Sequence, residues 1–242
     1  MAPAPAHCTC LLLFSALISG VHLQFSSSEK ALIYKPVLQP HESIPPTGTY
    51  MLRTATGVPC IRVTLGAEFL VLEQKTWYFN LDPSRVTVSG TCGSAVAILS
   101  LALHNEGGSL QFFFTKEKKV YYVKKITAHL SPFPVCKNCS RTYTGIVDHE
   151  KLFVSKGGRS FKCNSESLLH LSSTLRLKMV PLQMQAFSVP KGQYGKEVEC
   201  WADYNKRVIP IVIGAVIVGL LLIALLTYVI MRDRRRTGYE SL

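Results

Sequence analysis

The chain has 242 residues, 48% of them hydrophobic, and a formal net charge of +12 at pH 7. This length excludes an assembly of several large domains and leaves room for one modest domain plus targeting segments. The apolar residues are unevenly distributed, with one block near each end of the chain. The roughly 180 residues between the two blocks are enough for one self-supporting core.

The first apolar block, residues 8–21 (CTCLLLFSALISGV), lies close to the N-terminus. It is shorter than the ~20 residues that a helix needs to span a bilayer. The small residues Ser19 and Gly20 follow its leucine-rich part. We therefore predict a signal peptide over residues 1–23, cleaved within residues 18–24. The alternative is an uncleaved N-terminal anchor.

The second apolar block, residues 208–231, holds no charged residue. As a helix rising 1.5 Å per residue it would be about 36 Å long, which is enough to cross a bilayer. Pro210 would then lie in the first turn, where a missing N–H costs little. A buried core helix is the alternative, but such a helix is usually shorter. We predict a transmembrane helix.

Basic residues flank this predicted span unequally, with two before it and four directly after it. They are Lys206 and Arg207, then Arg232, Arg234, Arg235 and Arg236. This bias predicts a cytoplasmic C-terminus, the orientation that a cleaved signal peptide also requires. The expected topology is type I, with residues 232–242 as a cytoplasmic tail. Binding of anionic lipid headgroups is a second use for the arginines.

The positive charge does not predict a nucleic-acid partner. Without the tail the net charge is still about +10, and all of it is expected on the luminal side, away from the genome. Anionic glycans and anionic lipids of luminal vesicles are the alternatives that this charge leaves open.

The segment between the two apolar blocks divides by composition. Residues 24–47 contain four prolines and little periodicity, which predicts an extended linker stub. Residues 48–207 form the predicted luminal domain. In this domain apolar and polar residues alternate over 61–65 and again over 174–179, the pattern of half-buried strands. No long stretch shows helical periodicity, so we predict an antiparallel, mostly-β domain.

One β-hairpin is indicated by residues 111–115 and 120–123, which flank a charged tip. Five lysines lie at or beside this tip: Lys116, Lys118, Lys119, Lys124 and Lys125. They could bind a ligand, but we interpret them as charges that keep an edge strand from pairing with other chains.

Six cysteines remain after removal of the signal peptide: Cys60, Cys92, Cys136, Cys139, Cys163 and Cys200. An even number in a secreted context indicates disulfides, and six cysteines allow 15 pairings. Cys136 and Cys139 are predicted to form a local disulfide, with intermolecular pairing as the alternative. A redox centre would need a helix N-terminus at this pair, and a zinc site would need two more ligands; His149 is the nearest candidate.

Several short motifs around these cysteines resemble the lysosome-associated membrane glycoprotein (LAMP) family. They are Gly48-Thr-Tyr50, Gly57-Val-Pro-Cys60, Phe79-Asn-Leu-Asp-Pro83, Ser89-Gly-Thr-Cys-Gly93, Phe161-Lys-Cys-Asn164, Gln185-Ala-Phe187, Gly192-Gln-Tyr-Gly195 and Glu199-Cys200. The resemblance runs from about residue 48 to the C-terminus. Within the family the chain is most similar to the dendritic-cell member, through its YFN-LDP run, Phe114-Thr-Lys116 and Tyr121-Tyr122.

The resemblance implies a luminal β-prism domain with disulfides Cys60–Cys92 and Cys163–Cys200, and residence in late endosomal and lysosomal membranes. Three features depart from the family pattern. The linker is short, Cys136 and Cys139 are additional, and one glycosylation sequon is present, Asn138-Cys139-Ser140. Because Cys139 is a predicted disulfide partner, occupancy of Asn138 is disfavoured.

The predicted tail, RDRRRTGYESL, is too short to fold, so it must act as a linear peptide. Tyr239 and Leu242 fit a Tyr-x-x-apolar sorting signal, and Gly238 leaves the backbone before it free. The family resemblance implies binding to clathrin adaptor medium subunits. A phosphotyrosine site without a trafficking role is the alternative.

No catalytic residue, cofactor site or metal site is predicted, because the chain lacks P-loop, G-x-G-x-x-G, G-x-S-x-G and H-E-x-x-H motifs. The leading hypothesis is a non-enzymatic membrane glycoprotein that supports lysosomal membrane integrity, maturation or fusion. The alternatives are a cell-surface adhesion or ligand-binding receptor that recycles through endosomes, and a thiol oxidoreductase using Cys136 and Cys139. Ala215 and Gly219 could allow two spans to form a homo-oligomer.

Overall fold

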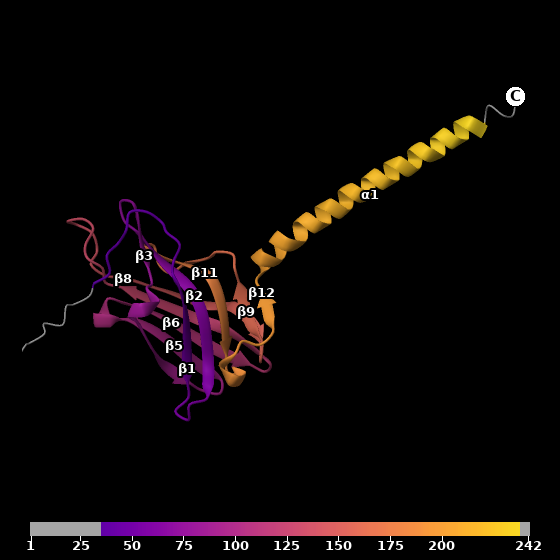
Figure 1. Cartoon of the computed structure of the whole chain (residues 1–242). Coiled ribbons are helices and arrows are strands. Elements are labelled where there is room, and N and C mark those ends of the chain that lie inside the picture. The colour runs from indigo at the N-terminus through magenta and orange to yellow at the C-terminus, as the bar shows by residue number, and fades with distance from the viewer. Residues whose placement is uncertain (1–34, 238–242) are drawn as a thin grey trace, which may run out of the picture. The chain divides into compact units, whose positions relative to one another are not determined.

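The computed structural model describes residues 35–237, which form twelve strands followed by one long helix (Figure 1). The strands are β1 (Thr47–Arg53), β2 (Pro59–Leu72), β3 (Thr76–Asn80), β4 (Val86–Cys92), β5 (Val96–Leu103), β6 (Gly108–Glu117), β7 (Val120–Leu130), β8 (Tyr143–Lys156), β9 (Ser160–Cys163), β10 (Ser167–His170), β11 (Leu175–Ala186) and β12 (Glu197–Glu199). The helix is α1 (Trp201–Thr237). The predicted signal peptide and the sorting residues Gly238, Tyr239 and Leu242 lie outside the described part of the chain.

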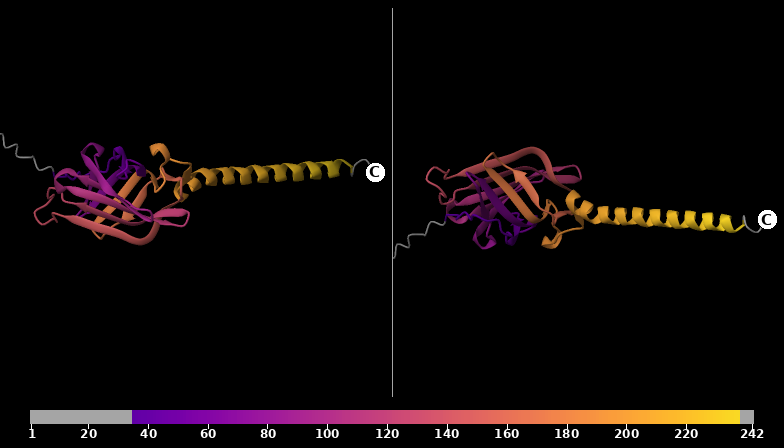
Figure 2. Two further views of the ribbon diagram at one scale, coloured as in Figure 1. Left: turned by 90° about the horizontal axis from the view of Figure 1, so that it is seen from below. Right: turned by 90° about the horizontal axis from the view of Figure 1, so that it is seen from above.

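The strands form two sheets (Figure 2). One is a five-stranded antiparallel meander in the order β4-β5-β6-β7-β8. The other is built on the two long strands β2 and β11: β1 and β3 pair with β2, while β9 and β10 pair with β11. β12 joins this second sheet by parallel pairing with β9. The prediction of a mostly-β domain is confirmed.

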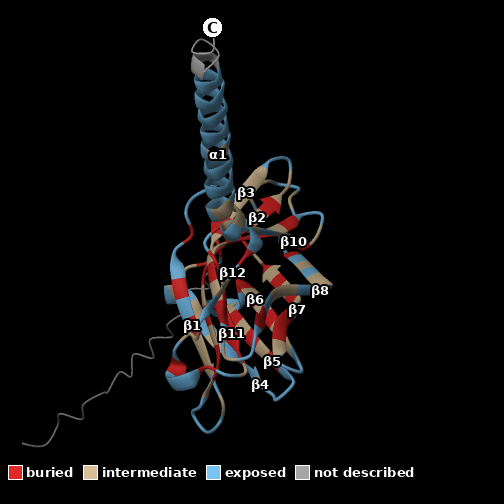
Figure 3. Cartoon of the chain, turned by 90° about the vertical axis from the view of Figure 1, so that its right-hand side faces the viewer, coloured by how far each residue is buried: buried red, intermediate tan, exposed pale blue. Residues whose placement is uncertain are grey.

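The core forms where apolar residues alternate along strands of both sheets. In β2 the side chains of Ile61, Val63 and Leu65 are buried, and β11 buries Leu175 and Leu177 in the same way. In β5 and β6 of the five-stranded sheet the buried positions include Ala97, Leu99, Leu101, Leu110, Phe112 and Phe114. Figure 3 shows buried residues along the strands and exposed residues along α1. Both predicted alternating segments therefore lie in strands that share one core.

The predicted hairpin is β6–β7, with Lys118 at its tip in the left-handed region at φ 54°. Its strands are not edges: β6 pairs with β5 as well as β7, and β7 pairs with β8 along most of its length. The interpretation of the lysines as protectors of an edge strand is therefore wrong for β6 and β7. The sequence identified the hairpin but not its place inside the sheet.

The predicted linker packs on the domain in the part that the structure describes, residues 35–46, here called the N-terminal strap. The strap buries Leu38 and Pro45, and the backbone of Gln39 forms two hydrogen bonds with Tyr78 of β3, of 2.7 and 2.9 Å. The strap thus covers part of the β3 edge. Proline lowers the tendency to form strands but does not prevent such packing.

The helix α1 contains the predicted span, residues 208–231, and extends beyond it at both ends. Pro210 is therefore inside the helix and not in its first turn. Among the described residues α1 is the one helix long and apolar enough to cross a membrane, and none of its apolar stretch is covered by protein. Such a surface requires an apolar environment.

Candidate functional site: the membrane-proximal junction

The chain passes from the β domain into α1 without a flexible connection. β12 ends at Glu199, Cys200 donates its N–H to the carbonyl of Lys162 at 2.9 Å, and α1 begins at the next residue, Trp201. A disulfide joins Cys200 to Cys163 at the end of β9. The residue directly before the helix is thus bonded to β9 through both its backbone and its side chain.

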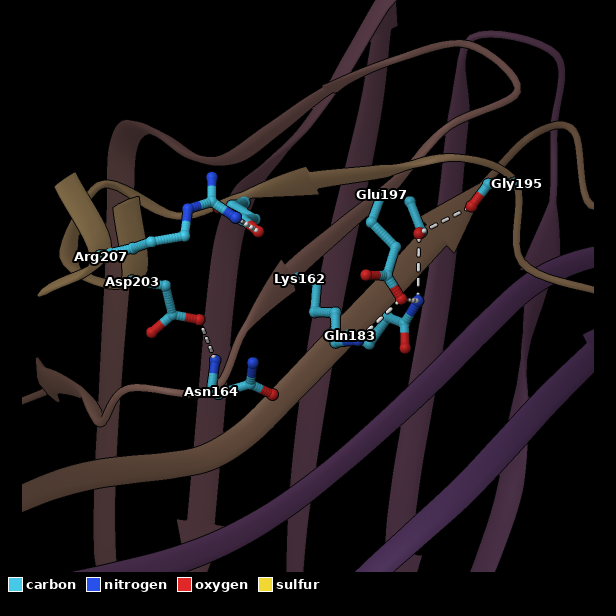
Figure 4. Close-up of polar contacts among 9 residues, drawn as sticks. Lys162, Asn164, Gln183, Gly195, Glu197, Asp203 and Arg207 are labelled. Carbon is cyan, nitrogen blue, oxygen red and sulfur yellow. Dashed lines mark hydrogen bonds and ion pairs between the residues drawn. The ribbon is translucent and has the colours of Figure 1, made fainter. Parts of the chain in front are cut away.

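Asp203, in the first turn of α1, holds the loop that follows β9 (Figure 4). Its carboxylate accepts the N–H of Asn164 at 2.6 Å and the N–H of Ser165 at 2.8 Å. Hydrogen bonds from N–H groups to a charged acceptor are stronger than those between neutral groups. This residue was not identified from the sequence; an acidic side chain in the first turn of a helix is a recognisable signal, but only once the helix is known to begin at Trp201.

Two ion pairs lie beside this contact (Figure 4). Arg207 of α1 donates to Glu199 at 2.8 Å, and Lys162 of β9 donates to Glu197 of β12 at 2.8 Å. All four side chains are partly exposed, so each pair contributes at most about 1 kcal/mol to stability. The two ion pairs orient these four side chains, but they add little to the stability of the junction.

The Gly192-Gln-Tyr-Gly195 motif shapes the approach to the junction. A Cβ on Gly195 would lie 1.9 Å from the carbonyl oxygen of Gly158, so this position requires glycine. The N–H of Gly195 donates to the side chain of Gln185 at 2.7 Å, and this glutamine is fully buried. The Gln185-Ala-Phe187 and Gly192-Gln-Tyr-Gly195 motifs, which both carry the family resemblance, are therefore in contact through this hydrogen bond. The contact positions the start of β12.

Tyr194 ties the same motif to the long strand β2. Its hydroxyl donates to Thr64 at 2.8 Å, and the guanidinium of Arg62 lies 4.6 Å from the centre of its ring. Burial raises the pKa of the Tyr194 hydroxyl above its ordinary value, although Thr64 and Arg62 act in the opposite direction. The hydroxyl therefore stays protonated and serves as a structural donor.

The structure contains the two disulfides that the resemblance implied. Cys60 of β2 is joined to Cys92 of β4, so this bond links the two sheets. Cys163–Cys200 closes the junction. The sequence separations are 32 and 37 residues.

Cys136 and Cys139 form a third disulfide, in a turn between β7 and β8. The next element after this turn is the strand β8, so Cys136 does not lie at a helix N-terminus, where a thiol–disulfide oxidoreductase has its cysteine pair. Asn138, between the two cysteines, is exposed. The backbone N–H of Ser140, the third residue of the sequon, donates a hydrogen bond to the carboxylate of Glu73 at 3.3 Å.

One group of potential metal ligands occurs among the described residues, formed by Cys163, Cys200 and Asp203. Both cysteines are oxidised to the disulfide, so neither offers the thiolate that a metal requires. The carboxylate of Asp203 already accepts hydrogen bonds from two backbone N–H groups. The cluster is structural.

Replacing Asp203 with alanine should loosen the junction without unfolding the domain. The N–H groups of Asn164 and Ser165 would lose a charged acceptor, and their amide hydrogen exchange should accelerate roughly tenfold or more. Exchange measured by mass spectrometry on the full chain in detergent would show this. Asp203→Asn retains one acceptor oxygen and should fall between the wild type and Asp203→Ala. Unchanged exchange at both amides would contradict the role of the carboxylate.

The fold and the junction define a class of protein: a disulfide-bonded β domain fixed directly to a single membrane-spanning helix. Comparison with known families identifies the family to which this protein belongs. Residues 35–201 match the family described as "Lysosome-associated membrane glycoprotein 2-like, luminal domains", and residues 209–240 match "Lysosome-associated membrane glycoprotein 2, transmembrane segment". The chain belongs to the LAMP family.

Individual relatives agree with this membership. Human lysosome-associated membrane glycoprotein 3 is 33% identical over 212 residues, covering 86% of this chain and 49% of the relative. Bovine lysosome-associated membrane glycoprotein 1 is 31% identical over 192 residues, covering 76% and 46%. The chain thus spans about half the length of the curated relatives that it matches.

Solved structures show the same fold. The crystal structure of human LAMP-3, also called DC-LAMP, superimposes with a TM-score of 0.58 at 31% identity, covering 64% of this chain and 99% of that one. The membrane-proximal domain of mouse LAMP-1 gives a TM-score of 0.57 at 23% identity, covering 66% and 99%. The similarity to the dendritic-cell member, predicted from the motifs, is confirmed.

Proposed function

We propose that this protein is a non-enzymatic type I glycoprotein of late endosomal and lysosomal membranes, which supports membrane integrity, maturation or fusion. The luminal domain would face the lumen, and residues 232–242 would face the cytosol. Family membership carries this proposal, since the relatives are named as lysosome-associated membrane glycoproteins. The arginines that follow the span support the orientation.

Delivery to lysosomes would depend on the tail. Tyr239 and Leu242 have the spacing of a peptide that places two side chains in adjacent pockets of an adaptor medium subunit. The described part of α1 runs to Thr237. The signal would be read as a short extended peptide.

Replacing Tyr239 with alanine should move most of the protein to the cell surface. Surface biotinylation and microscopy of the full chain would measure this, with Ser241→Ala as the matched control because position 241 contributes no pocket-filling side chain. Tyr239→Phe separates sorting from phosphorylation, since the phenylalanine ring retains part of the pocket contact but no phosphate acceptor. If Tyr239→Ala still reached lysosomes normally, the sorting proposal would be wrong. A wild-type chain found mainly at the surface would favour the recycling adhesion receptor.

Homo-oligomerisation stays a prediction. A Cβ at Gly219 would meet no atom within 4 Å, so this face of α1 is open to a second helix. Cross-linking of the chain in membranes, compared with Gly219→Leu, would test it.

A further inference from the structure

Two exposed aromatic side chains stand at the start of α1. The side chain of Trp201 is 74% exposed and that of Tyr204 is 44% exposed. Their rings stack, with centroids 5.8 Å apart and an angle of 21° between planes. Neither ring is part of the core of the β domain, so folding alone does not account for them.

The two rings line a surface hollow together with three charged residues. Its walls are Glu197, Glu199, Trp201, Tyr204 and Arg207. Along the chain the carboxylates come first, the rings follow, and the guanidinium is nearest to the apolar part of α1. Trp201, Tyr204 and Arg207 are spaced three residues apart, or about 4.5 Å along the helix for each step.

The position of the hollow corresponds to the headgroup layer of a bilayer. The polar layer on each side of the hydrocarbon is roughly 5–8 Å thick. Tyr204, about 6 Å before Val208 along the helix, lies within this layer, and Trp201, about 10 Å before Val208, lies at its aqueous side. Tryptophan and tyrosine are enriched at this level in membrane proteins. The disulfide and Asp203 hold this part of α1 against the β domain, so the hollow has a fixed shape.

The chemistry of the lining distinguishes between headgroups. Aromatic faces attract quaternary ammonium groups. Arg207 offers five N–H donors, of which the structure uses one toward Glu199, so others are available for a phosphate. Because Glu197 and Glu199 are already paired with Lys162 and Arg207, the two exposed rings are the groups of the hollow that attract a further cation. We propose that the hollow binds the phosphocholine headgroup of a bilayer lipid, with the quaternary ammonium at the rings and the phosphate at Arg207.

This binding site goes beyond lysosomal delivery and does not depend on it. Only its assignment to the luminal leaflet rests on the orientation proposed above. A reconstituted chain therefore tests the site even if the sorting signal proves inactive.

The two tryptophans of the chain, Trp77 and Trp201, permit a direct test. The Trp77→Phe variant of the full chain retains Trp201 alone and would be reconstituted in nanodiscs with a fixed fraction of a lipid whose choline carries a nitroxide quencher. The remaining lipid would be either phosphatidylcholine or phosphatidylethanolamine. Unlabelled phosphatidylcholine should displace the quencher about twofold to fivefold more effectively, the ratio expected for a cation–π contact at an exposed site.

Two further variants complete the experiment. Tyr204→Leu in the same background should remove the difference between the two lipids while leaving the Cys163–Cys200 disulfide intact by mass spectrometry. Trp201→Phe leaves only Trp77, on β3, and its fluorescence should show no lipid dependence. Equal quenching in both lipids, an unchanged preference in Tyr204→Leu, or no quenching of Trp201 in any bilayer would each overturn the proposal.

Discussion

The Lys178→Met variant should lose about 3–5 kcal/mol of unfolding free energy, the usual cost of removing one partner of a buried ion pair. Lys178 of β11 forms ion pairs with Glu68 of β2 and Glu42 of the N-terminal strap. Glu68 is fully buried, and it also accepts the N–H of Ser43 at 3.1 Å. Without the lysine, its carboxylate would remain in the core with no cation beside it. Guanidinium titration of the full chain in detergent, followed by tryptophan fluorescence, would measure the loss.

Two control variants define the cause of this loss. Lys162→Met removes a partner from the exposed pair with Glu197, which should cost less than about 1 kcal/mol. The double variant Lys178→Met/Glu68→Leu removes both charges and should recover much of the lost stability, because apolar residues can replace a buried pair without a net penalty. Equal small losses for Lys178→Met and Lys162→Met would show that the buried pair has no special role.

The pH dependence of the stability that this buried ion pair contributes follows from the pKa of Lys178. Burial lowers the pKa of Lys178, but the hydrogen bonds to Glu42 and Glu68 outweigh burial and raise it above its ordinary value. A lysine with a raised pKa in the folded state stabilises the fold below its unfolded pKa and loses this effect as pH rises through the folded pKa. On the lysine side the contribution therefore persists at neutral and acidic pH and is lost only in strongly alkaline solution.

The same cluster shows where prediction from the sequence ends. The strands around Ile61 and Leu175 were predictable because alternation is a local property of the chain. Their pairing was not: β2 and β11 are neighbours although more than 100 residues separate Glu68 from Lys178. The burial of that pair depends on this distant contact. The strap was predicted as a linker for the same reason, since its partner Tyr78 lies 39 residues from Gln39.

The junction was predictable in outline only. The apolar run and its flanking charges located the membrane helix, and the family motifs implied the Cys163–Cys200 pair. The start of the helix at Trp201 was missed because residues 201–207 are polar and aromatic and do not continue the apolar pattern. The acceptor role of Asp203 depends on Asn164 and Ser165, which the fold brings to it from the loop after β9.

Removing the junction disulfide with Cys163→Ala/Cys200→Ala should lower the unfolding free energy by about 4 kcal/mol. The disulfide closes a loop in the unfolded chain, and without it the unfolded state regains the entropy of a loop of this length. The Cys136→Ala/Cys139→Ala variant opens a loop of only three residues' separation and should lose about 2 kcal/mol or less on the same basis. Guanidinium titrations of both variants, compared with the wild type, would measure the difference. Equal losses would show that loop length does not determine the contribution of these bonds.

A second comparison separates chain entropy from anchoring of α1. If the disulfide acts only on the unfolded chain, adding Asp203→Ala to the Cys163→Ala/Cys200→Ala variant should cost as much as it does in the wild type, because independent effects add. If the bond also positions Asp203 against the loop after β9, the carboxylate should contribute less once the bond is gone. A coupling above about 0.5 kcal/mol in the double-mutant cycle would support anchoring. A coupling near zero would leave the disulfide as a restraint on the unfolded chain alone, with Asp203 holding the junction independently.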